Sequence, residues 1–562
     1  MKRQILYLLS TVVLVAAQPA LNSAGTARAQ QFLVVETAEG REVLLADEVE
    51  SITVERDSVF YDHLLPAAIA ADPATQIFGQ ALQLTGLADS LTAFVDDTYP
   101  EMTDKERIRW FYSFNVSNYM EIPIVRRRSF TAFVEPDSIF AAHGIRSLTD
   151  LEAYARRIYD EAFPEDKGIS DPADRRHPLN RFVAYHLLPF GSTYDELTPN
   201  PIMFYRRLAD VSDWYQTLLP CGSLKFSRPR GEEEGIYLNR RGIASDPDPY
   251  GLKVRGARII PSKSGEWTQT TSNGAYYYID DLLAYDLTTQ RETLNERWRI
   301  SALSLSPDFM THGIRALTPL DGTLNFDYDR VFISSYLDNY IVADSSYVGV
   351  LLPRKYYWNY ETDISFQAIE HPEQGRCDLT LALPALPEGD YELRFGTTMY
   401  ARSPRVRFSL DGVLLADSVD FQNINDKQLE ERIGWKDYTT DSAEVYVRRE
   451  MRSRGWMRGP KERALCTIGA GAQYDEPTSA NSWPMSSIAR NARSVVGRFH
   501  SDGRRAKQLR IESIPYTNEE MEQRGVVNGS YLGGSYYSEP IKLDYIELCP
   551  VWIADNEEIP ED

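Results

Sequence analysis

The chain has 562 residues, and its 82 Asp and Glu residues against 60 Lys and Arg residues give a formal net charge of −22. Nucleic acids and anionic membrane surfaces are bound by clustered Lys and Arg side chains, so this balance argues against both as partners. Hydrophobic residues make up 43% of a chain long enough for about two to four domains, which indicates a globular rather than a disordered protein.

Residues 1–29 have the three parts of a secretory signal peptide. Lys2 and Arg3 form a basic start, an apolar run follows over 5–17, and Ala27 and Ala29 provide the small residues of a cleavage site. The apolar run is shorter than the ~20 residues of a membrane-spanning helix, and no later stretch reaches that length. We therefore expect an exported protein without a transmembrane segment after cleavage, and the cleavage takes the net charge to −25.

The segment 30–56 is predicted to contain a β-hairpin. Two apolar runs, 32–35 and 43–45, flank a turn at Gly40, and short apolar runs separated by a glycine turn are typical of paired strands.

Between about 57 and 287 the pattern mixes helices and short strands. Apolar residues at three- and four-residue spacing predict an amphipathic helix from Ile77 to Leu91. Two capping-box pairs, Thr103 with Glu106 and Thr149 with Glu152, predict the starts of two further helices. Pro178 is predicted to begin another helix, which stops before Pro189. The expected strands are 129–134, 222–226, 235–239, 254–260 and 275–285. The fold class of this region is therefore α+β.

Three segments of this region resemble the ordered landmarks of a fasciclin-type domain. The early segment is matched by Thr131, Phe133, Pro136, Asp137 and Phe140, with Glu135 where the family usually has a small polar residue. A Tyr-His pair follows at Tyr185-His186, and the closing strand is matched by Asn273, Gly274, Ile279 and Asp280. The resemblance implies a fasciclin-type domain over 57–287, with an insertion near 190–220.

The remaining half, 288–562, is predicted to be a β-sandwich. The expected strands lie in 378–399, 406–419, 508–514 and 541–550, and Asp411-Gly412 is a strong hairpin turn. This half resembles the galactose-binding-like jelly rolls found as carbohydrate-binding modules. The matching positions are Pro387, Gly389, Tyr391, Leu393 and Arg394, followed by a late strand over 543–548.

Further segments resemble the C-terminal half of fasciclin-domain surface proteins of Bacteroidota; they are 296–315, Gly434-Trp435 and 453–460. Such proteins accompany outer-membrane nutrient-uptake systems, so the resemblance implies a location at the cell surface, on the outer membrane or in the periplasm. A TonB-dependent transporter complex is then an expected partner. Many relatives are lipoproteins, but this chain has no cysteine near the cleavage site. Its anchoring stays open, and docking onto a membrane protein is the simpler expectation.

No catalytic or metal-binding residue can be assigned from the sequence. His186 is expected to be a hydrogen-bonded core residue, and the chain has neither an H-E-x-x-H nor a G-x-S-x-G motif. The segment 246–251 resembles a calcium loop, but Tyr250 is not a suitable ligand. We expect no cofactor. A structural calcium ion in the sandwich remains an alternative for which no ligands are assigned.

The four cysteines, Cys221, Cys377, Cys466 and Cys549, allow three complete disulfide pairings. Cys466 and Cys549 both fall in expected strands and are the pair to test. The alternative is four buried free thiols.

Aromatic residues are the best candidates for ligand binding, because exposed rings stack on the C–H face of a sugar. The candidates are Tyr356, Trp358, Tyr360, Trp435 and Trp456. The competing interpretation is that these rings belong to the sandwich core.

These observations favour a non-enzymatic surface protein for binding or adhesion, with a glycan or a surface protein as its partner. It would be a glycan-binding accessory of an uptake complex. The alternatives are a carbohydrate-active enzyme with an unrecognised carboxylate pair, and a passive structural spacer.

Overall fold

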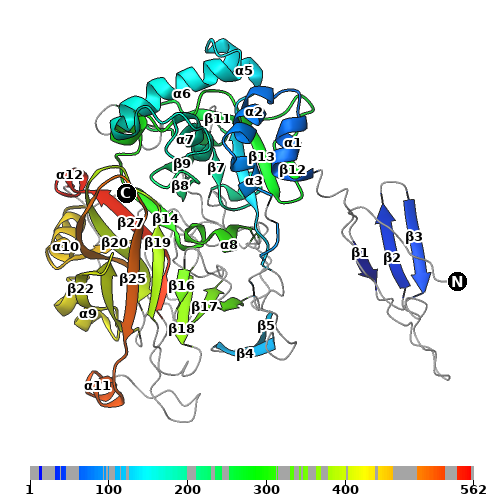
Figure 1. Ribbon diagram of the computed structural model, residues 1–562. Coiled ribbons are helices and arrows are strands. Elements are labelled where there is room, and N and C mark those ends of the chain that lie inside the picture. The colour runs from blue at the N-terminus through cyan, green and yellow to red at the C-terminus, as the bar shows by residue number, and fades with distance from the viewer. Residues whose placement is uncertain are drawn as a thin grey trace, which may run out of the picture. The chain divides into compact units, whose positions relative to one another are not determined.

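The protein is described by a computed structural model (Figure 1). The described residues are 12–15, 32–37, 40–45, 63–92, 94–96, 99, 108–113, 116–121, 126–198, 211–229, 234–242, 252–311, 313, 329–333, 341–343, 346–351, 363–368, 378–399, 403–436, 441–459, 490–525 and 541–557. The chain divides into two compact units, Met1–His63 and Leu64–Asp562.

The first unit contains one antiparallel sheet of three strands. They are β1 (Val12–Val15), β2 (Phe32–Thr37) and β3 (Gly40–Leu45), in the order β1-β2-β3. Strands β2 and β3 pair from Phe32 opposite Leu45 to Thr37 opposite Gly40, which confirms the predicted hairpin, although Gly40 is the first residue of β3 and not the centre of the turn. The expected cleavage site at Ala27–Ala29 lies outside the described residues.

The N-terminal part of the second unit is built on an eight-stranded sheet that almost closes into a barrel. The strands are β6 (Phe130–Val134), β7 (Leu187–Leu188), β8 (Val211–Gln216), β9 (Ser223–Arg228), β10 (Tyr237–Leu238), β11 (Ala257–Ile260), β12 (Gln269–Thr271) and β13 (Gly274–Ile279). Their order is β7-β6-β13-β11-β10-β9-β8, with β12 also paired to β13. Only β6 and β13 are parallel among these pairs. The Leu218 amide, just after β8, donates to the Leu187 carbonyl at 2.8 Å and joins the two ends.

Helices pack together on one side of these strands, as predicted for an α+β region (Figure 1). They are α1 (Leu65–Ala71), α2 (Gln76–Leu84), α3 (Leu87–Ser90), α5 (Asp137–Ala142), α6 (Leu148–Ala162), α7 (Pro178–Tyr185) and the 3₁₀ turns η3 (Pro164–Asp166) and η4 (Tyr194–Glu196). The predicted helix from 77 to 91 is interrupted because Gly86 adopts a φ of 67°. The N-cap of α6 is Ser147, two residues before the predicted Thr149, and its hydroxyl accepts the Asp150 amide.

The predicted helix start at Thr103 and Glu106 lies outside the described residues. The next described element is the strand β4 (Ile108–Ser113), which is paired with β5 (Val116–Glu121).

The C-terminal part is a β-sandwich, as predicted. One five-stranded sheet has the order β14 (Trp298–Ser301), β27 (Tyr545–Pro550), β20 (Gly389–Met399), β24 (Arg490–Ser501) and β23 (Trp456–Arg458). The other has the order β16 (Ile341–Ala343), β19 (Asp378–Leu383), β25 (Lys507–Ile514), β21 (Arg405–Leu410) and β22 (Val413–Asp420). Buried side chains interdigitate between them, with Phe395 of β20 and Phe408 of β21 having ring centroids 5.1 Å apart.

The late run 541–550 forms two strands rather than one. Asp544 separates β26 (Ile541–Leu543) from β27. Strand β26 belongs to a third sheet, ordered β15 (Asp329–Ile333), β17 (Ser346–Leu351), β18 (Asp363–Ala368) and β26. The hairpin at Asp411-Gly412 is confirmed, with φ values of 48° and 81°.

Helices also occur in this half, where the sequence analysis expected few. They are α8 (Pro307–Thr311), α9 (Asp426–Ile433), α10 (Asp441–Ser453), α11 (Asn518–Gln523) and α12 (Val551–Ala554), with shorter turns at η6 (Thr289–Thr293) and η7 (Ala302–Leu305).

The barrel and the sandwich share one hydrophobic core. Trp214 of β8 stacks on Trp298 of β14, with ring centroids 5.9 Å apart and planes 12° from parallel. Two hydrogen bonds to Ala385 cross the same boundary. Its carbonyl accepts the Ser223 hydroxyl at 2.8 Å, and its amide donates to Gln216 Oε1 at 2.8 Å. The two parts are therefore bound together by buried contacts.

Candidate functional site

The three segments that resemble a fasciclin-type domain come together in the barrel. The early segment forms β6, which lies beside β13 from the closing segment. The side chain of Asn273 accepts the Leu65 amide at 2.8 Å and donates to the Leu91 carbonyl at 2.6 Å. The Thr131 hydroxyl donates to the Phe190 carbonyl at 2.8 Å. These polar side chains bind the backbone, so they stabilise the fold.

His186 and Glu135 form a fully buried pair inside the barrel region. His186 Nδ1 lies 2.7 Å from the Phe182 carbonyl, which can only accept, so the hydrogen is assigned to Nδ1. His186 Nε2 lies 3.0 Å from Glu135 Oε1, and this contact needs one proton between the two atoms. The same oxygen accepts the Leu283 amide at 3.0 Å. The expectation that His186 is a hydrogen-bonded core residue is confirmed.

A second buried charge cluster lies in the sandwich. Glu547 of β27 has no exposed surface and is contacted by three arginines. The closest nitrogens of Arg299, Arg394 and Arg493 lie 2.9, 2.7 and 2.7 Å from its carboxylate oxygens. Burial alone would raise the pKa of Glu547, but these guanidinium groups outweigh it and hold the pKa well below its usual range. The cluster is an internal ion-pair network.

Two of the aromatic residues predicted to bind a ligand are buried. Trp435 and Trp456 are 5% and 7% exposed. The edge of Trp456 packs on Phe421 with centroids 5.5 Å apart, and the Arg458 guanidinium lies 4.3 Å from the Trp435 ring centroid. A sugar ring cannot stack on rings packed in this way, so these two assignments are corrected to core positions. The other three predicted residues, Tyr356, Trp358 and Tyr360, lie outside the described residues.

Cys221 and Cys549 are buried free thiols. The Cys549 Sγ atom lies 3.7 Å from the Pro550 carbonyl oxygen, and its free state agrees with the alternative of free thiols that the sequence left open beside a Cys466–Cys549 pair. Cys377 and Cys466 lie outside the described residues, as does the calcium-like segment 246–251.

We expect Cys221 and Cys549 to resist alkylation in the native protein. Burial raises the pKa of each thiol to about 11, which leaves about one thiol in a thousand ionised at pH 8, and only the thiolate reacts. Iodoacetamide labelling at pH 8, read by peptide mass spectrometry, should modify both residues only after unfolding in guanidinium chloride. A Cys466–Cys549 cross-linked peptide in a non-reducing digest would contradict this expectation.

The barrel region carries an exposed tryptophan at a well-defined place. Trp267 lies between β11 and β12 and is 37% exposed. It follows a tight turn in which the Ser262 amide donates to the Glu266 carbonyl at 2.8 Å, and Gly265 adopts a φ of 92°. The turn and the following strand hold the indole at the surface.

Tyr194 supports this indole from a second element, the turn η4. The ring centroids of Trp267 and Tyr194 are 5.0 Å apart, with planes inclined by 41°. The Arg228 guanidinium, at the end of β9, lies 5.6 Å from the Tyr194 ring centroid. Asp195 Oδ1 accepts from Arg228 Nη2 at 3.1 Å. We call these four residues, Trp267, Tyr194, Arg228 and Asp195, the aromatic platform.

Local contacts fix the position of Tyr194. A capping box precedes it, in which Glu196 Oε2 accepts from both the amide and the hydroxyl of Thr193, at 2.9 and 2.7 Å. Partial burial raises the pKa of Tyr194, while the nearby Arg228 and Arg258 act in the opposite direction. The tyrosine therefore stays neutral at physiological pH and presents an uncharged ring.

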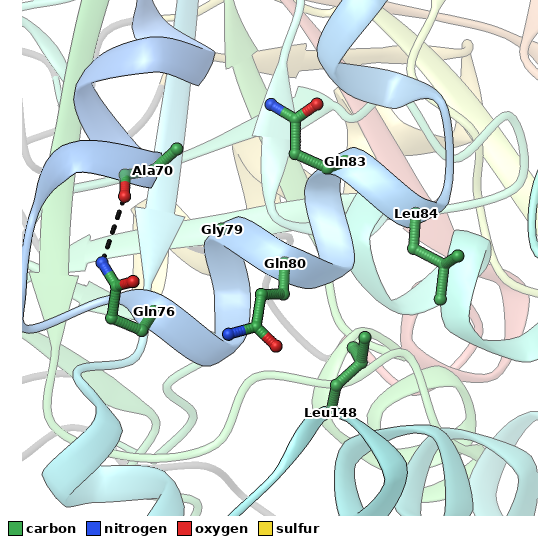
Figure 2. A pocket seen from close by; sticks show the side chains of 7 residues that line it. All are labelled: Ala70, Gln76, Gly79, Gln80, Gln83, Leu84 and Leu148. Atoms are coloured by element: carbon green, nitrogen blue, oxygen red, sulfur yellow. Dashed lines mark hydrogen bonds between the residues drawn. The ribbon is translucent and has the colours of Figure 1, made fainter.

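A separate hollow of about 520 Å³ lies over α2. Figure 2 shows its lining, which consists of Ala70, Gln76, Gly79, Gln80, Gln83, Leu84 and Leu148. Gln76 Nε2 donates to the Ala70 carbonyl at 3.1 Å, and this bond orients one of the three amides. The lining carries no charged side chain, so this hollow offers neutral hydrogen-bonding groups and aliphatic surface.

Within the described ranges, no three His, Cys, Asp or Glu side chains gather as metal ligands. No helix in the described part of the chain combines the length and apolar composition needed to cross a membrane.

No protein-family model and no curated protein matches the chain. Among solved structures, a family 35 carbohydrate binding module from Clostridium thermocellum is similar to it over 39% of this chain and 97% of that chain. The identity is 9% and the TM-score is 0.16, a likeness too small to bear on fold or ligand.

The aromatic platform was not predicted from the sequence. Trp267 directly follows the segment 262–266, which has the composition of a turn, and a tryptophan at such a place is unlikely to reach a core. This position after a turn is a sequence pattern that indicates an exposed Trp267. Nothing in the sequence indicates that Tyr194, more than 70 residues earlier, lies against it.

Proposed function

We propose that the protein is an exported, non-enzymatic glycan-binding protein whose ligand stacks on the aromatic platform. The observation that carries this proposal is the exposed indole of Trp267 held against Tyr194. The C–H face of a sugar ring packs well on such a surface, and neighbouring polar groups can fix its orientation. Arg228 and Asp195 are placed to supply them.

Two fully buried carboxylates are closed to a polysaccharide. Glycoside hydrolysis uses two carboxyl groups that both reach the scissile bond. Glu135 and Glu547 are fully buried and bound by His186 and by arginines, so a polysaccharide cannot reach either carboxylate.

We further propose that the two parts correspond to a fasciclin-type domain and a galactose-binding-like sandwich of a surface protein. Support comes from the packing of β6, α7 and β13, which carry the three resembling segments, and from the sandwich that follows. In this proposal the protein is held at the outer membrane by a TonB-dependent transporter complex. Co-purification of such a transporter with the tagged protein from detergent extracts would test this part.

Substitution of Trp267 by alanine is expected to weaken glycan binding by about tenfold or more, because the stacking surface is lost. The measurement is isothermal titration of the protein lacking 1–29 with ligands selected on a glycan array. Tyr446→Ala is a matched control, because Tyr446 is a 68% exposed aromatic on α10 outside the platform. Equal losses in both variants, or no glycan bound at all, would refute the proposal. Release of reducing ends from a bound polysaccharide would show a glycosidase instead.

A further inference from the structure

We infer that the ligand of the aromatic platform is an acidic glycan, and that Arg228 binds its carboxylate at the place now held by Asp195. This inference rests on the proposed function and specifies its ligand class. Guanidinium groups bind carboxylates through two parallel hydrogen bonds, which is the strongest polar contact available to a uronic acid.

The two members of the Arg228–Asp195 ion pair differ in how firmly they are held. The Arg228 side chain is 19% exposed, belongs to a strand and lies near the Tyr194 ring. The Asp195 side chain is 82% exposed. An ion pair with one such exposed partner contributes little to stability, so a ligand carboxylate can replace Asp195 at small cost.

A second guanidinium of the same region belongs to Arg258 on β11 and lies 5.8 Å from the ring centroid of Tyr237. Arg258 also acts to lower the pKa of Tyr194 and donates through Nη2 to the Glu234 carbonyl at 2.6 Å. Its buried Nε atom has no hydrogen-bond partner within the described part of the chain. Arg228 thus supplies a guanidinium group at the platform, although the chain as a whole carries a net charge of −22.

The acidic overall charge of the protein limits how an acidic glycan can be bound. A polyanionic ligand is repelled at long range by the protein, so binding has to come from short contacts at Arg228. Within the described part of the chain, Arg228 forms its ion pair with Asp195. Asp195 is thus the carboxylate that competes directly with a ligand for Arg228.

The test uses two variants that act in opposite directions. Arg228→Gln should weaken binding of acidic glycans by about 10- to 100-fold, because a hydrogen bond to a charged group is lost. Asp195→Asn should strengthen the same binding a few-fold, because the internal competitor is removed. The probes are polygalacturonate, alginate and hyaluronan, each compared by titration with its carboxyl-reduced neutral form. Both variants should change binding of the neutral forms far less than binding of the acidic forms, and thermal unfolding checks that both variants are folded.

The outcomes separate this inference from the proposed function. If neutral and acidic forms bind equally and Arg228→Gln changes neither, while Trp267→Ala abolishes both, the platform binds glycans but the acidic class is wrong. If Asp195→Asn weakens acidic binding, Asp195 supports the site and the replacement is wrong. If no glycan binds and Trp267→Ala has no effect, the proposed function itself fails. Should Arg228→Gln unfold the protein, Arg228→Lys, which keeps the charge without the paired hydrogen bonds, must show an intermediate loss for acidic forms alone.

Discussion

Replacing Glu547 by glutamine is expected to lower the free energy of unfolding by about 3–5 kcal/mol. The carboxylate is fully buried and accepts from Arg299, Arg394 and Arg493. A neutral amide of the same size removes the buried negative charge that the three guanidinium groups share, although Glu392 and Glu557 provide further carboxylates for Arg394, each at 2.8 Å. Weakening the compensation of buried charges is costly. Urea denaturation followed by tryptophan fluorescence measures the loss.

The same substitution predicts a dependence on pH. The pKa of Glu547 is lower in the folded than in the unfolded protein, so ionisation stabilises the fold at pH values above the unfolded pKa. That stabilisation is lost as the pH falls through the folded pKa. The difference between the parent protein and Glu547→Gln should therefore be constant near neutrality and begin to shrink only below about pH 4.

Asp390→Asn provides the control for this prediction. Asp390 lies on β20, next to the cluster in sequence, but its side chain is 70% exposed and pairs with an exposed His500 at 2.9 Å. Such a pair contributes about 0–1 kcal/mol, so this variant should be nearly as stable as the parent. A loss for Glu547→Gln no larger than that of the control would contradict the importance assigned to the buried network.

Replacing Gly274 by alanine is expected to lower the free energy of unfolding by at least about 3 kcal/mol. Gly274 begins β13 with a φ of 144°, a conformation that side chains rarely adopt. A Cβ atom there would lie 1.8 Å from the Phe130 carbonyl oxygen of the neighbouring strand. Since the parallel pairing of β6 and β13 starts at these two residues, the substitution should separate the strands at the centre of the barrel.

The variant Gly144→Ala is the control for Gly274→Ala, because it has the conformational strain without the steric overlap. Gly144 follows α5 with a φ of 80°, but nothing lies within 4 Å of a Cβ atom at that position. The substitution Gly144→Ala should therefore lower the free energy of unfolding by only about 1–2 kcal/mol, which is the cost of a left-handed conformation. Thermal unfolding of both variants gives the comparison, and equal stabilities would show that β6 and β13 can separate without penalty.

The elements that could be predicted are those specified by local sequence. The Asp411-Gly412 hairpin has its turn residues at the required positions, and the alternation in β21 matches its alternating burial. Helix α9 has local signals as well, since Asn425 caps it and Gly434 ends it with a φ of 75°. These two signals lie in a region whose pattern otherwise predicts mainly strands, so the helix was not predicted.

Other features depend on contacts between distant residues. The division of 541–550 at Asp544 follows from pairing with two different sheets, and no local pattern contains that information. The burial of Trp456 follows from the pairing of β23 with β24, whose first residue is Arg490. Trp435 and Trp456 are therefore core residues although the sequence suggested exposed rings, while Trp267, which follows a turn, is exposed.

The stacked pair Trp214 and Trp298 has a consequence for how such a chain can evolve. Domains that meet only through a linker can be duplicated, exchanged or lost as independent cassettes. Here each part supplies one ring of a buried pair, and Ala385 supplies backbone hydrogen bonds to the other part. Recombination at the boundary would expose apolar surface on both products, so the barrel and the sandwich should be inherited together. Changes in ligand preference are then expected to arise by substitution at surface residues such as those around Trp267, without exchange of either part.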